Sequence, residues 1–499
     1  MPPRRHCLQN GTGSLDHSGS TDTTGQRGPN GMMPRLAAIS SGRMLFVIAA
    51  AILLLATPVV QLVGESSGVL ANTREALLFL PANLLMFYAM GLYRRDAMVA
   101  LRRTMTRVPL IAGMGAVLAA GSNMLASTLY QWPAEHPSDW ADVAAQVTTA
   151  VVLFSLAAML ARIVFRVLLR GGLLHRHLLV IGAGARAWDL LFMLRREGST
   201  LNDVIVFLHE PSMGAVDERL VADPRARLVS GISPLQAAKD ADADQIVVAP
   251  DERRGMDLEL LLACKKAGFP VIQYLSFVEK EIRRVDLKRI ELGWLLYSEG
   301  FQFDLLDRML KRTFDLVVSA LVLALMSPFL VLAMIAIRIE GPGAVLYRQT
   351  RVTRDGKNFE IMKLRTMRTD AEAGGAVWAR KNDDRITKIG HFLRRTRIDE
   401  LPQLLNILKG EMSFVGPRPE RPQFVAELAS KIPLYNERHM VKAGLTGWAQ
   451  INYPYGASVD DARSKLSYDL YYVKNFSILF DFVILLQTLR VVLWPSGVR

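Results

Sequence analysis

Cysteine is nearly absent from this chain, which has only Cys7 and Cys264 among its 499 residues. The two lie far apart and match no metal-ligand spacing, so neither a disulfide framework nor a zinc site is predicted. Acidic residues are outnumbered by basic ones, 47 against 60. A basic balance can indicate nucleic-acid binding. However, the chain is 51% hydrophobic and its arginines cluster beside apolar runs, which favours a membrane protein with no nucleic-acid partner.

The first 42 residues lack any long apolar run. They are rich in Gly, Ser, Thr, Pro and Arg, and this composition predicts a disordered cytoplasmic tail over residues 1–42. A cleaved signal peptide is not expected, because the first apolar run starts near Met44 and is long enough to span a membrane.

Four uncharged runs follow, each about as long as a helix needs to cross ~30 Å of hydrocarbon. Five arginines lie between the second and third runs, whereas Arg74 is the only Lys or Arg in the outer loops. This asymmetry predicts a four-helix transmembrane bundle over residues 43–170 with both ends in the cytoplasm. Four core helices of a soluble protein are the alternative, which leaves the asymmetry without a cause. The runs are Met44–Val63, Ala76–Tyr93, Val108–Tyr130 and Val143–Ala161.

A short apolar strand, a glycine turn and a helical stretch begin the next segment. His177–Ile181 is followed by Gly182-Ala-Gly184-Ala-Arg-Ala187 and a helical pattern to Arg196. The order predicts a Rossmann-like α/β domain over residues 176–300. A GxGxxA pattern alone is a weak sign of a bound dinucleotide, and Glu210 lies beyond the usual distance for a ribose-binding acid. A structural or regulatory domain is favoured, and nucleotide binding stays open.

A fifth apolar run, Leu316–Ile337, has basic residues at both ends and Ser327-Pro328 at its middle. Proline removes a helical hydrogen bond, and the serine hydroxyl can satisfy the freed backbone. We therefore predict a re-entrant helix over residues 314–338 that bends there and returns to the cytoplasmic face. A kinked fifth span is the alternative. The last apolar run, Ile478–Trp494, is interrupted by charges and predicts an interfacial amphipathic helix.

The motif Asp399-Glu400-Leu-Pro-Gln403 is the most informative one, and Arg418 follows 19 residues after Asp399 within Gly416-Pro-Arg418-Pro419. One carboxylate can attack phosphorus, and a second can hold Mg²⁺, which prefers hard oxygen ligands. An arginine presents a planar fork to phosphate oxygens. The alternative is that the two acids only stabilise the dipole of a helix N-terminus.

From about Lys311 to Leu493 the chain resembles the bacterial polyprenyl-phosphate hexose-1-phosphate transferases, the initiating enzymes of surface polysaccharide assembly. The N-terminal spans and the Rossmann-like domain resemble the large, exopolysaccharide-type members. Ten ordered segments carry the resemblance: Lys311-Arg312-Thr-Phe-Asp315, Ser327-Pro328, Gly341-Pro-Gly343, Tyr347-Arg-Gln-Thr-Arg351, Met362-Lys363-Leu-Arg365-Thr-Met, Ile389-Gly-His-Phe-Leu-Arg394, Asp399-Glu400-Leu-Pro-Gln403, Gly410-Glu-Met-Ser-Phe, Gly416-Pro-Arg418-Pro419 and Gly444-Leu-Thr446-Gly-Trp-Ala-Gln450.

The resemblance implies a two-step exchange between a UDP-sugar and undecaprenyl phosphate. Asp399 is expected to attack the sugar-bearing phosphorus, release UMP and hold the phosphosugar until the lipid phosphate takes it. Glu400 is expected to hold Mg²⁺, and Arg418 to bind the transferred phosphoryl oxygens. Six further positions are assigned to binding phosphate or substrate, or to positioning the carboxylates: Lys363, Arg365, Arg394, Thr446, Gln450 and Asp469.

The implied fold is a multi-pass protein of the bacterial inner membrane, with a mainly helical catalytic domain, residues 301–499, on the cytoplasmic face. Membrane lipids and a second copy of the chain in a homodimer are further expected partners. Two other classes fit less well. A membrane nucleotide-sugar dehydratase or epimerase is expected to carry Tyr-x-x-x-Lys, and no Tyr here has Lys four residues on. A non-catalytic assembly subunit is expected to lack part of the set Asp399, Glu400 and Arg418, which is complete.

Overall fold

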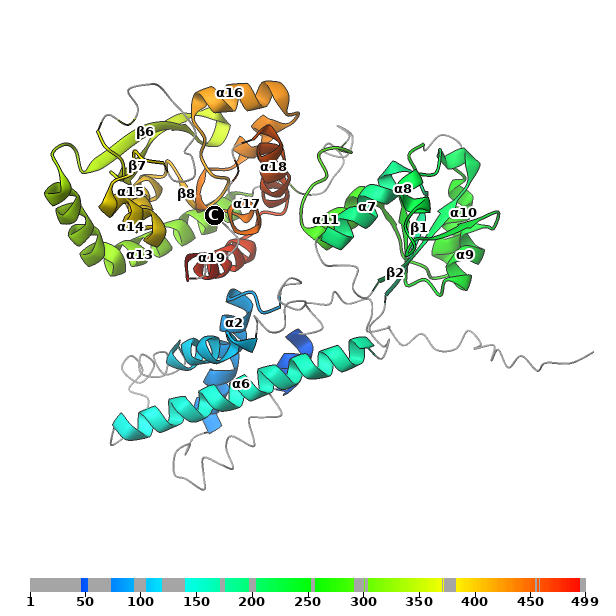
Figure 1. The fold of residues 1–499 in the computed structure, drawn as a ribbon, viewed down its shortest axis with the longest axis horizontal. Coiled ribbons are helices and arrows are strands. Elements are labelled where there is room, and N and C mark those ends of the chain that lie inside the picture. Colours follow the sequence, from blue (N-terminus) through cyan, green and yellow to red (C-terminus); the bar gives the residue numbers. More distant parts are fainter. Residues whose placement is uncertain are drawn as a thin grey trace, which may run out of the picture.

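A computed structural model places three groups of elements along the chain, which are helices before residue 171, a parallel sheet with its helices, and a C-terminal domain (Figure 1). The predicted tail, residues 1–42, lies outside the residues that the structure describes. The described residues are 46–52, 73–93, 105–118, 140–170, 176–196, 203–252, 256–290, 300, 304–369, 371, 383–453, 456 and 458–493.

Each of the four predicted membrane runs contains helical residues. Ala49, Phe87, Ile111 and Ala158 belong to one apolar core that joins four helical segments. Gly115 allows a close approach, because a Cβ there would lie 2.5 Å from the Asn83 side-chain oxygen. The helices are residues 46–52, α2 (Thr73–Ala89), residues 108–118 and α6 (Trp140–Arg170).

Two described helices are long and apolar enough to cross a membrane by length and composition, one over Val151–Leu168 and one over Leu305–Glu340. They indicate membrane association. The finer prediction of a four-helix bundle with both ends in the cytoplasm stays a prediction.

The middle of the chain forms a five-stranded parallel sheet in the order β3-β2-β1-β4-β5. Successive side chains of a strand point to opposite faces. Leu178 and Val180 of β1 therefore pack with α7 and α11 on one face, and Leu179 and Ile181 pack with α9 and α10 on the other. The elements are β1 (Arg176–Ile181), α7 (Ala185–Arg196), β2 (Asp203–His209), α8 (Glu218–Val221), β3 (Arg227–Ser230), α9 (Pro234–Asp240), β4 (Gln245–Val248), α10 (Leu258–Lys266), β5 (Val271–Gln273) and α11 (Tyr274–Ile282).

The C-terminal domain is mainly helical, as predicted, with one antiparallel pair, β6–β7, and one short parallel pair, β8–β9. Its apolar core joins β7, α15, β8, α17, α18 and α19. The elements are α13 (Leu305–Glu340), β6 (Leu346–Val352), β7 (Asn358–Leu364), α14 (Lys388–Thr396), the 3₁₀ turn η5 (Ile398–Glu400), α15 (Gln403–Lys409), β8 (Ser413–Val415), α16 (Pro422–Lys431), η6 (Tyr435–Met440), β9 (Gly444–Thr446), α17 (Trp448–Asn452), α18 (Val459–Lys474) and α19 (Ile478–Leu493).

Both ends of α13 are attached to this domain. Near its start, Arg312 donates to the carbonyls of Ile407 and Leu408 at the end of α15, both at 2.6 Å. At its far end, Arg365 donates to the carbonyl of Ile337 at 3.2 Å. The apolar side chains between these attachments are largely exposed, including Leu321, Leu325, Phe329 and Leu332.

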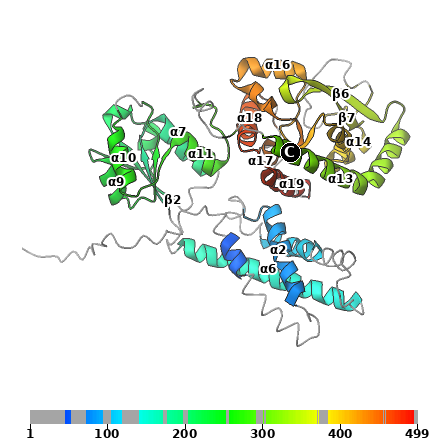
Figure 2. The ribbon, with the colours of Figure 1, turned by 180° about the vertical axis from the view of Figure 1, so that it is seen from behind.

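The helix α13 contains Pro328, and the Ser327 hydroxyl donates to the Ala324 carbonyl at 2.8 Å. The ribbon changes direction along its length in both views (Figures 1 and 2). Pro328 lacks the backbone N–H that a straight helix needs, so it accounts for such a bend.

The final helix, α19, has one face in the core and one exposed. Asp481 is fully buried and pairs with Lys311 at 2.6 Å, and Tyr472 donates to its carboxylate at 2.8 Å. Leu479 and Val492 remain exposed. The predicted interfacial helix therefore carries an apolar exposed face and is also tied to the start of α13.

Residues of α11 and the segment just after it pack against the C-terminal domain. The Trp448 indole N–H donates to the Arg283 carbonyl at 2.8 Å, and Lys474 pairs with Glu279 at 2.7 Å. Val285 is buried in a small core with Leu470. The sheet unit is thus joined to the C-terminal domain by direct contacts as well as by the chain.

Candidate active site

The two carboxylates of the Asp-Glu motif lie in the 3₁₀ turn η5, between α14 and α15. Arg397, with a φ of 63°, ends α14 in the left-handed conformation and reverses the chain into this turn. Pro402 then precedes α15, whose first turn accommodates proline. A 3₁₀ turn has 3.0 residues per turn, so the Asp399 and Glu400 side chains diverge by about 120° and have different surroundings.

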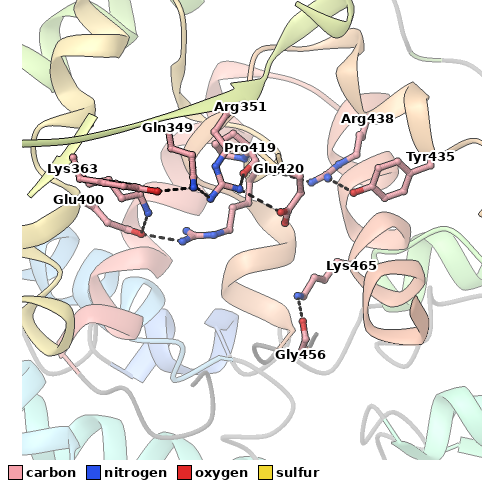
Figure 3. A network of polar contacts seen from close by, with 12 residues as sticks. Gln349, Arg351, Lys363, Glu400, Pro419, Glu420, Tyr435, Arg438, Gly456 and Lys465 are labelled. Atoms are coloured by element: carbon pink, nitrogen blue, oxygen red, sulfur yellow. Dashed lines mark hydrogen bonds and ion pairs between the residues drawn. The ribbon is translucent and has the colours of Figure 1, made fainter. Parts of the chain in front are cut away.

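Glu400 is held by two cations. Its Oε1 atom accepts from Lys363 Nζ at 3.3 Å and from Arg418 Nη2 at 3.0 Å, and Figure 3 shows the carboxylate facing Lys363. Burial alone would raise the pKa of Glu400, but the charges of Arg418 and Lys363 outweigh it and hold the pKa well below its ordinary value. Glu400 is therefore ionised at neutral pH.

Asp399 is buried and only 8% exposed. Its Oδ1 atom has no hydrogen-bond partner among the described residues. Burial and the neighbouring negative charge of Glu400 raise its pKa to about 6, against the opposing charges of Lys363 and Arg394. A buried carboxylate oxygen without a hydrogen-bond partner among the described residues is available to react.

Arg418 reaches the site from the loop after β8. Its Nη1 atom donates to Gln450 Oε1 at 3.4 Å, and its side chain is 37% exposed. The backbone on which it stands is fixed by two other arginines. Arg438 donates to the Arg418 carbonyl at 3.0 Å, and Arg351 donates to the Pro419 carbonyl at 3.3 Å.

Four of the residues predicted to form the site are brought together by direct contacts, namely Lys363, Glu400, Arg418 and Gln450, with Asp399 beside them in the same turn. Arg394 acts on Asp399 through its charge, while its Nε donates to Thr366 Oγ1 at 2.9 Å.

Three other predicted residues contact different parts of the domain. Arg365 caps the end of α13 by donating to carbonyls there, including that of Gly341 at 2.8 Å. The Thr446 hydroxyl lies 2.7 Å from that of Thr488. Asp469 is buried and pairs with Arg438 at 2.8 Å. Their roles towards substrate stay predictions.

Arg351 and Arg438 were given no role from the sequence. Arg351 follows Tyr347 and Gln349 on alternate positions of a strand, a pattern that could have indicated a polar face. Arg438 lies in the short helix η6, and its contact with Arg418 depends on chain segments that only the fold brings together.

A family model described as "Bacterial sugar transferase" matches residues 306–495. The chain is 38% identical over 252 residues to a "UDP-N-acetylgalactosamine-undecaprenyl-phosphate N-acetylgalactosaminephosphotransferase" of Aeromonas hydrophila, over 50% of this chain and 58% of the relative. It is 42% identical over 189 residues to the "Exopolysaccharide production protein PSS" of Rhizobium leguminosarum, over 37% of this chain and 94% of that protein. The chain belongs to the bacterial sugar transferase family.

Similarity extends further along one relative. An "Uncharacterized sugar transferase" of Haemophilus influenzae is 32% identical over 370 residues. The match covers 69% of the present chain and 74% of the Haemophilus protein. The match spans 58% of the Aeromonas protein and 40% of a "UDP-glucose:undecaprenyl-phosphate glucose-1-phosphate transferase" of Escherichia coli. The sugars named for these relatives differ.

A magnesium ion was predicted at Glu400. Among the described residues, no group of three or more His, Cys, Asp or Glu side chains converges to hold a metal by itself. Mg²⁺ is commonly bound by one or two carboxylates together with substrate phosphates, and it keeps part of its water shell. The unpaired Asp399 Oδ1 and the adjacent Glu400 carboxylate fit this mode, in which Glu400 would share its charge with Lys363 and Arg418.

In the present sugar transferase, the glycine turn after β1 faces the carboxylate of Asp251. Asp251, after β4, accepts from the backbone N–H of Ala185 at 2.6 Å and of Arg186 at 2.9 Å. These N–H groups begin α7, where a dinucleotide phosphate binds in domains that carry such a turn. A Cβ on Gly184 would lie 2.1 Å from the Asp251 carboxylate, so the glycine admits Asp251.

Proposed function

We propose that this protein transfers a hexose 1-phosphate from a UDP-sugar to undecaprenyl phosphate, with release of UMP, as a membrane step of exopolysaccharide synthesis. The observation that carries the proposal is the environment of Asp399. It has one oxygen without a partner, beside a carboxylate that two cations keep ionised. The names of the family relatives, which include undecaprenyl-phosphate sugar phosphotransferases, supply the substrate class.

In the first step, Asp399 Oδ1 attacks the sugar-bearing phosphorus of the UDP-sugar. A P–O bond to the carboxylate forms, and the P–O bond to the bridging oxygen breaks. UMP leaves with that electron pair. Lys363 and Arg418 lie beside the carboxylates and can bind the phosphate oxygens as negative charge accumulates there. Mg²⁺, when bound at Glu400 and the substrate phosphates, would screen the charge of the diphosphate.

In the second step, an oxygen of undecaprenyl phosphate attacks the same phosphorus. The bond to Asp399 breaks, and the carboxylate is restored while the lipid carries a diphosphate-linked sugar. Two displacements are easier than one direct reaction between two anions, because the protein presents its own nucleophile and releases one anion before the next reacts. Burial of Asp399 excludes water, which would otherwise hydrolyse the intermediate.

The proposed membrane arrangement has the catalytic domain on the cytoplasmic face and α13 entering and leaving by that face. A straight helix of 36 residues would be about 54 Å long. Both ends of α13 nevertheless contact one domain, through Arg312 and Arg365, while its middle exposes apolar side chains. These contacts support a bent, membrane-inserted helix that brings the site to the headgroup level.

The test is UMP release. Membranes containing the protein would be incubated with undecaprenyl phosphate, Mg²⁺ and each of a panel of UDP-sugars, including UDP-glucose, UDP-galactose and their N-acetylated forms. One or more donors should release UMP repeatedly when the lipid phosphate is present, and only one UMP per active site when it is absent. Rapid quenching without the lipid should trap one phosphosugar per active site on Asp399. Absence of UMP with every donor would contradict the proposal.

A further inference from the structure

One face of β6 carries a row of three polar side chains. Tyr347, Gln349 and Arg351 occupy alternate positions and therefore project to the same side of the strand. Gln349 Nε2 donates to the Tyr347 hydroxyl at 2.7 Å, and Arg351 Nη2 donates to Gln349 Oε1 at 2.6 Å. Figure 3 shows Gln349 and Arg351 side by side above Glu400. The amide of Gln349 thus links its two neighbours, accepting from one and donating to the other.

The Arg351 end of this row contacts the Arg418 loop. Arg351 Nη1 donates to the Pro419 carbonyl at 3.3 Å and lies 3.5 Å from Glu420 Oε2. The strand backbone adds a bond, because the N–H of Val352 donates to the Glu420 carbonyl at 3.0 Å. The peptide that follows Arg418 is therefore fixed to the end of β6.

The other end of the row lies beside Lys363. In the β6–β7 pair, Tyr347 is directly opposite Lys363. The row therefore extends between the two cations that hold Glu400, from Tyr347 beside Lys363 to Arg351 beside the loop of Arg418. The two cations come from separate segments, and the face of β6 connects them.

Arg351 occupies an electrostatically unfavourable place. Its side chain is 17% exposed, and burial lowers its pKa, with Glu420 opposing and the charges of Arg418 and Arg421 adding to the effect. A buried cation beside another cation is a poor way to stabilise a fold. Its hydrogen bonds to the Pro419 carbonyl and to Gln349 instead indicate a role in holding the loop that carries Arg418.

We propose that Arg351 and Gln349 are positioning residues that hold the Arg418-Pro419 backbone so that Arg418 meets Glu400 and the transferred phosphoryl group. The side chain of Arg418 is long, and its hydrogen bond to Gln450, at 3.4 Å, is weak. Fixing its backbone removes part of the freedom that it would otherwise lose on binding phosphate. The inference rests on the proposed function and adds two residues to which that function gave no role.

The test is a double-substitution cycle measured by UMP release. Arg351→Gln should lower kcat/KM by about ten- to a hundredfold, as expected for misplacement of a catalytic group. In an Arg418→Lys background, the same change should cost much less, because Arg418 is no longer there to be positioned. Arg351→Lys, which keeps the charge and one donor to Pro419, should recover part of the activity.

The matched control is Arg348, on the opposite face of the same strand. It lies 3.6 Å from Glu360, and both side chains are more than 60% exposed. Arg348→Gln should leave kcat/KM unchanged within about twofold in either background.

Equal costs of Arg351→Gln in both backgrounds would overturn the positioning role. Gln349→Met keeps the side-chain length and removes both hydrogen bonds, so it provides the same cycle if Arg351→Gln fails to fold. Additive costs there would also overturn the inference. An inactive wild type would instead contradict the proposed function, and the inference with it.

Discussion

Lys363 and Arg418 donate to the same oxygen of Glu400, at 3.3 and 3.0 Å. Their shared acceptor leaves Asp399, the adjacent residue, without a cation in direct contact in the described part of the chain. Glu400 is ionised and Asp399 lies beside that charge, so the two carboxylates of one turn have pKa values displaced in opposite directions. Environments that separate the pKa values of paired acids are typical of catalytic sites.

Asp399→Asn should abolish UMP release and raise thermal stability. The pKa of Asp399 is raised from 3.8 to about 6, so its ionised form is disfavoured in the folded state and destabilises the protein above that pH. Below 3.8 the group is protonated in both states and the difference disappears. The melting temperatures of the wild type and the Asn variant should therefore differ more at pH 7.5 than near pH 4. An Asn variant that keeps more than about a tenth of the turnover would show that Asp399 is not the nucleophile.

The pH profile of kcat/KM should fall on the acid side near pH 6, because the free protein needs Asp399 ionised and its pKa is about 6. Arg394 lowers that pKa. Arg394→Gln should therefore move the acid limb to higher pH, while Arg395→Gln, at an exposed neighbouring position, should leave it in place. A limb that does not move in the Arg394 variant would show that another group sets it.

The two ends of α13 should be accessible from the same side of the membrane. Single cysteines at Thr313 and Ala344, in a chain without Cys7 and Cys264, should both resist an impermeant thiol reagent in intact cells and react in inverted vesicles. Moving the flanking arginines into the membrane would cost on the order of 2.5–3.5 kcal/mol each at a helix centre. A cysteine at Ser138, in a predicted outer loop, is the positive control. Labelling of Ala344 alone in intact cells would mean a true crossing.

A truncated chain that begins at residue 301 should retain UMP release, because Asp399, Glu400 and Arg418 all lie later in the sequence. It should be less stable than one that begins at residue 283. The shorter chain loses buried Val285 and the Arg283 carbonyl to which Trp448 donates. Burial of one valine side chain is worth about 1.5–3 kcal/mol. Equal melting temperatures would show that this segment does not stabilise the domain. A folded but inactive 283–499 chain would show that earlier residues take part in the chemistry.

The glycine turn after β1 should not bind a dinucleotide phosphate in the wild-type chain, because Asp251 already accepts from the N–H groups that begin α7. Titration calorimetry with NAD, measured in the Asp399→Asn variant, should show no heat of binding. Tight binding of NAD that is lost in a variant with a bulky residue at Gly184 would contradict the prediction.

The sequence alone was sufficient for features that depend on local order. The Asp399-Glu400 pair, the arginine of the Pro-Arg-Pro segment, the parallel α/β alternation and the long apolar helix are all continuous stretches, so composition and spacing reveal them. The C-terminal domain is mainly helical, as predicted. This could be read from the sequence because the periodicity of a helix is carried by neighbouring residues.

Only the tertiary structure decided which charges meet. Lys363 comes from β7, Glu400 from η5 and Arg418 from the loop after β8, and nothing in their spacing shows that they share one oxygen. The same holds for Arg365, whose neighbour in the sequence motif is Lys363 but whose guanidinium lies at the end of α13. Arg365 lies just past the end of β7, so the alternation of the strand does not fix its direction, and its long side chain reaches a different partner. The energies of buried ions depend on such partners and on burial, and both are set by contacts between segments that are distant in the chain.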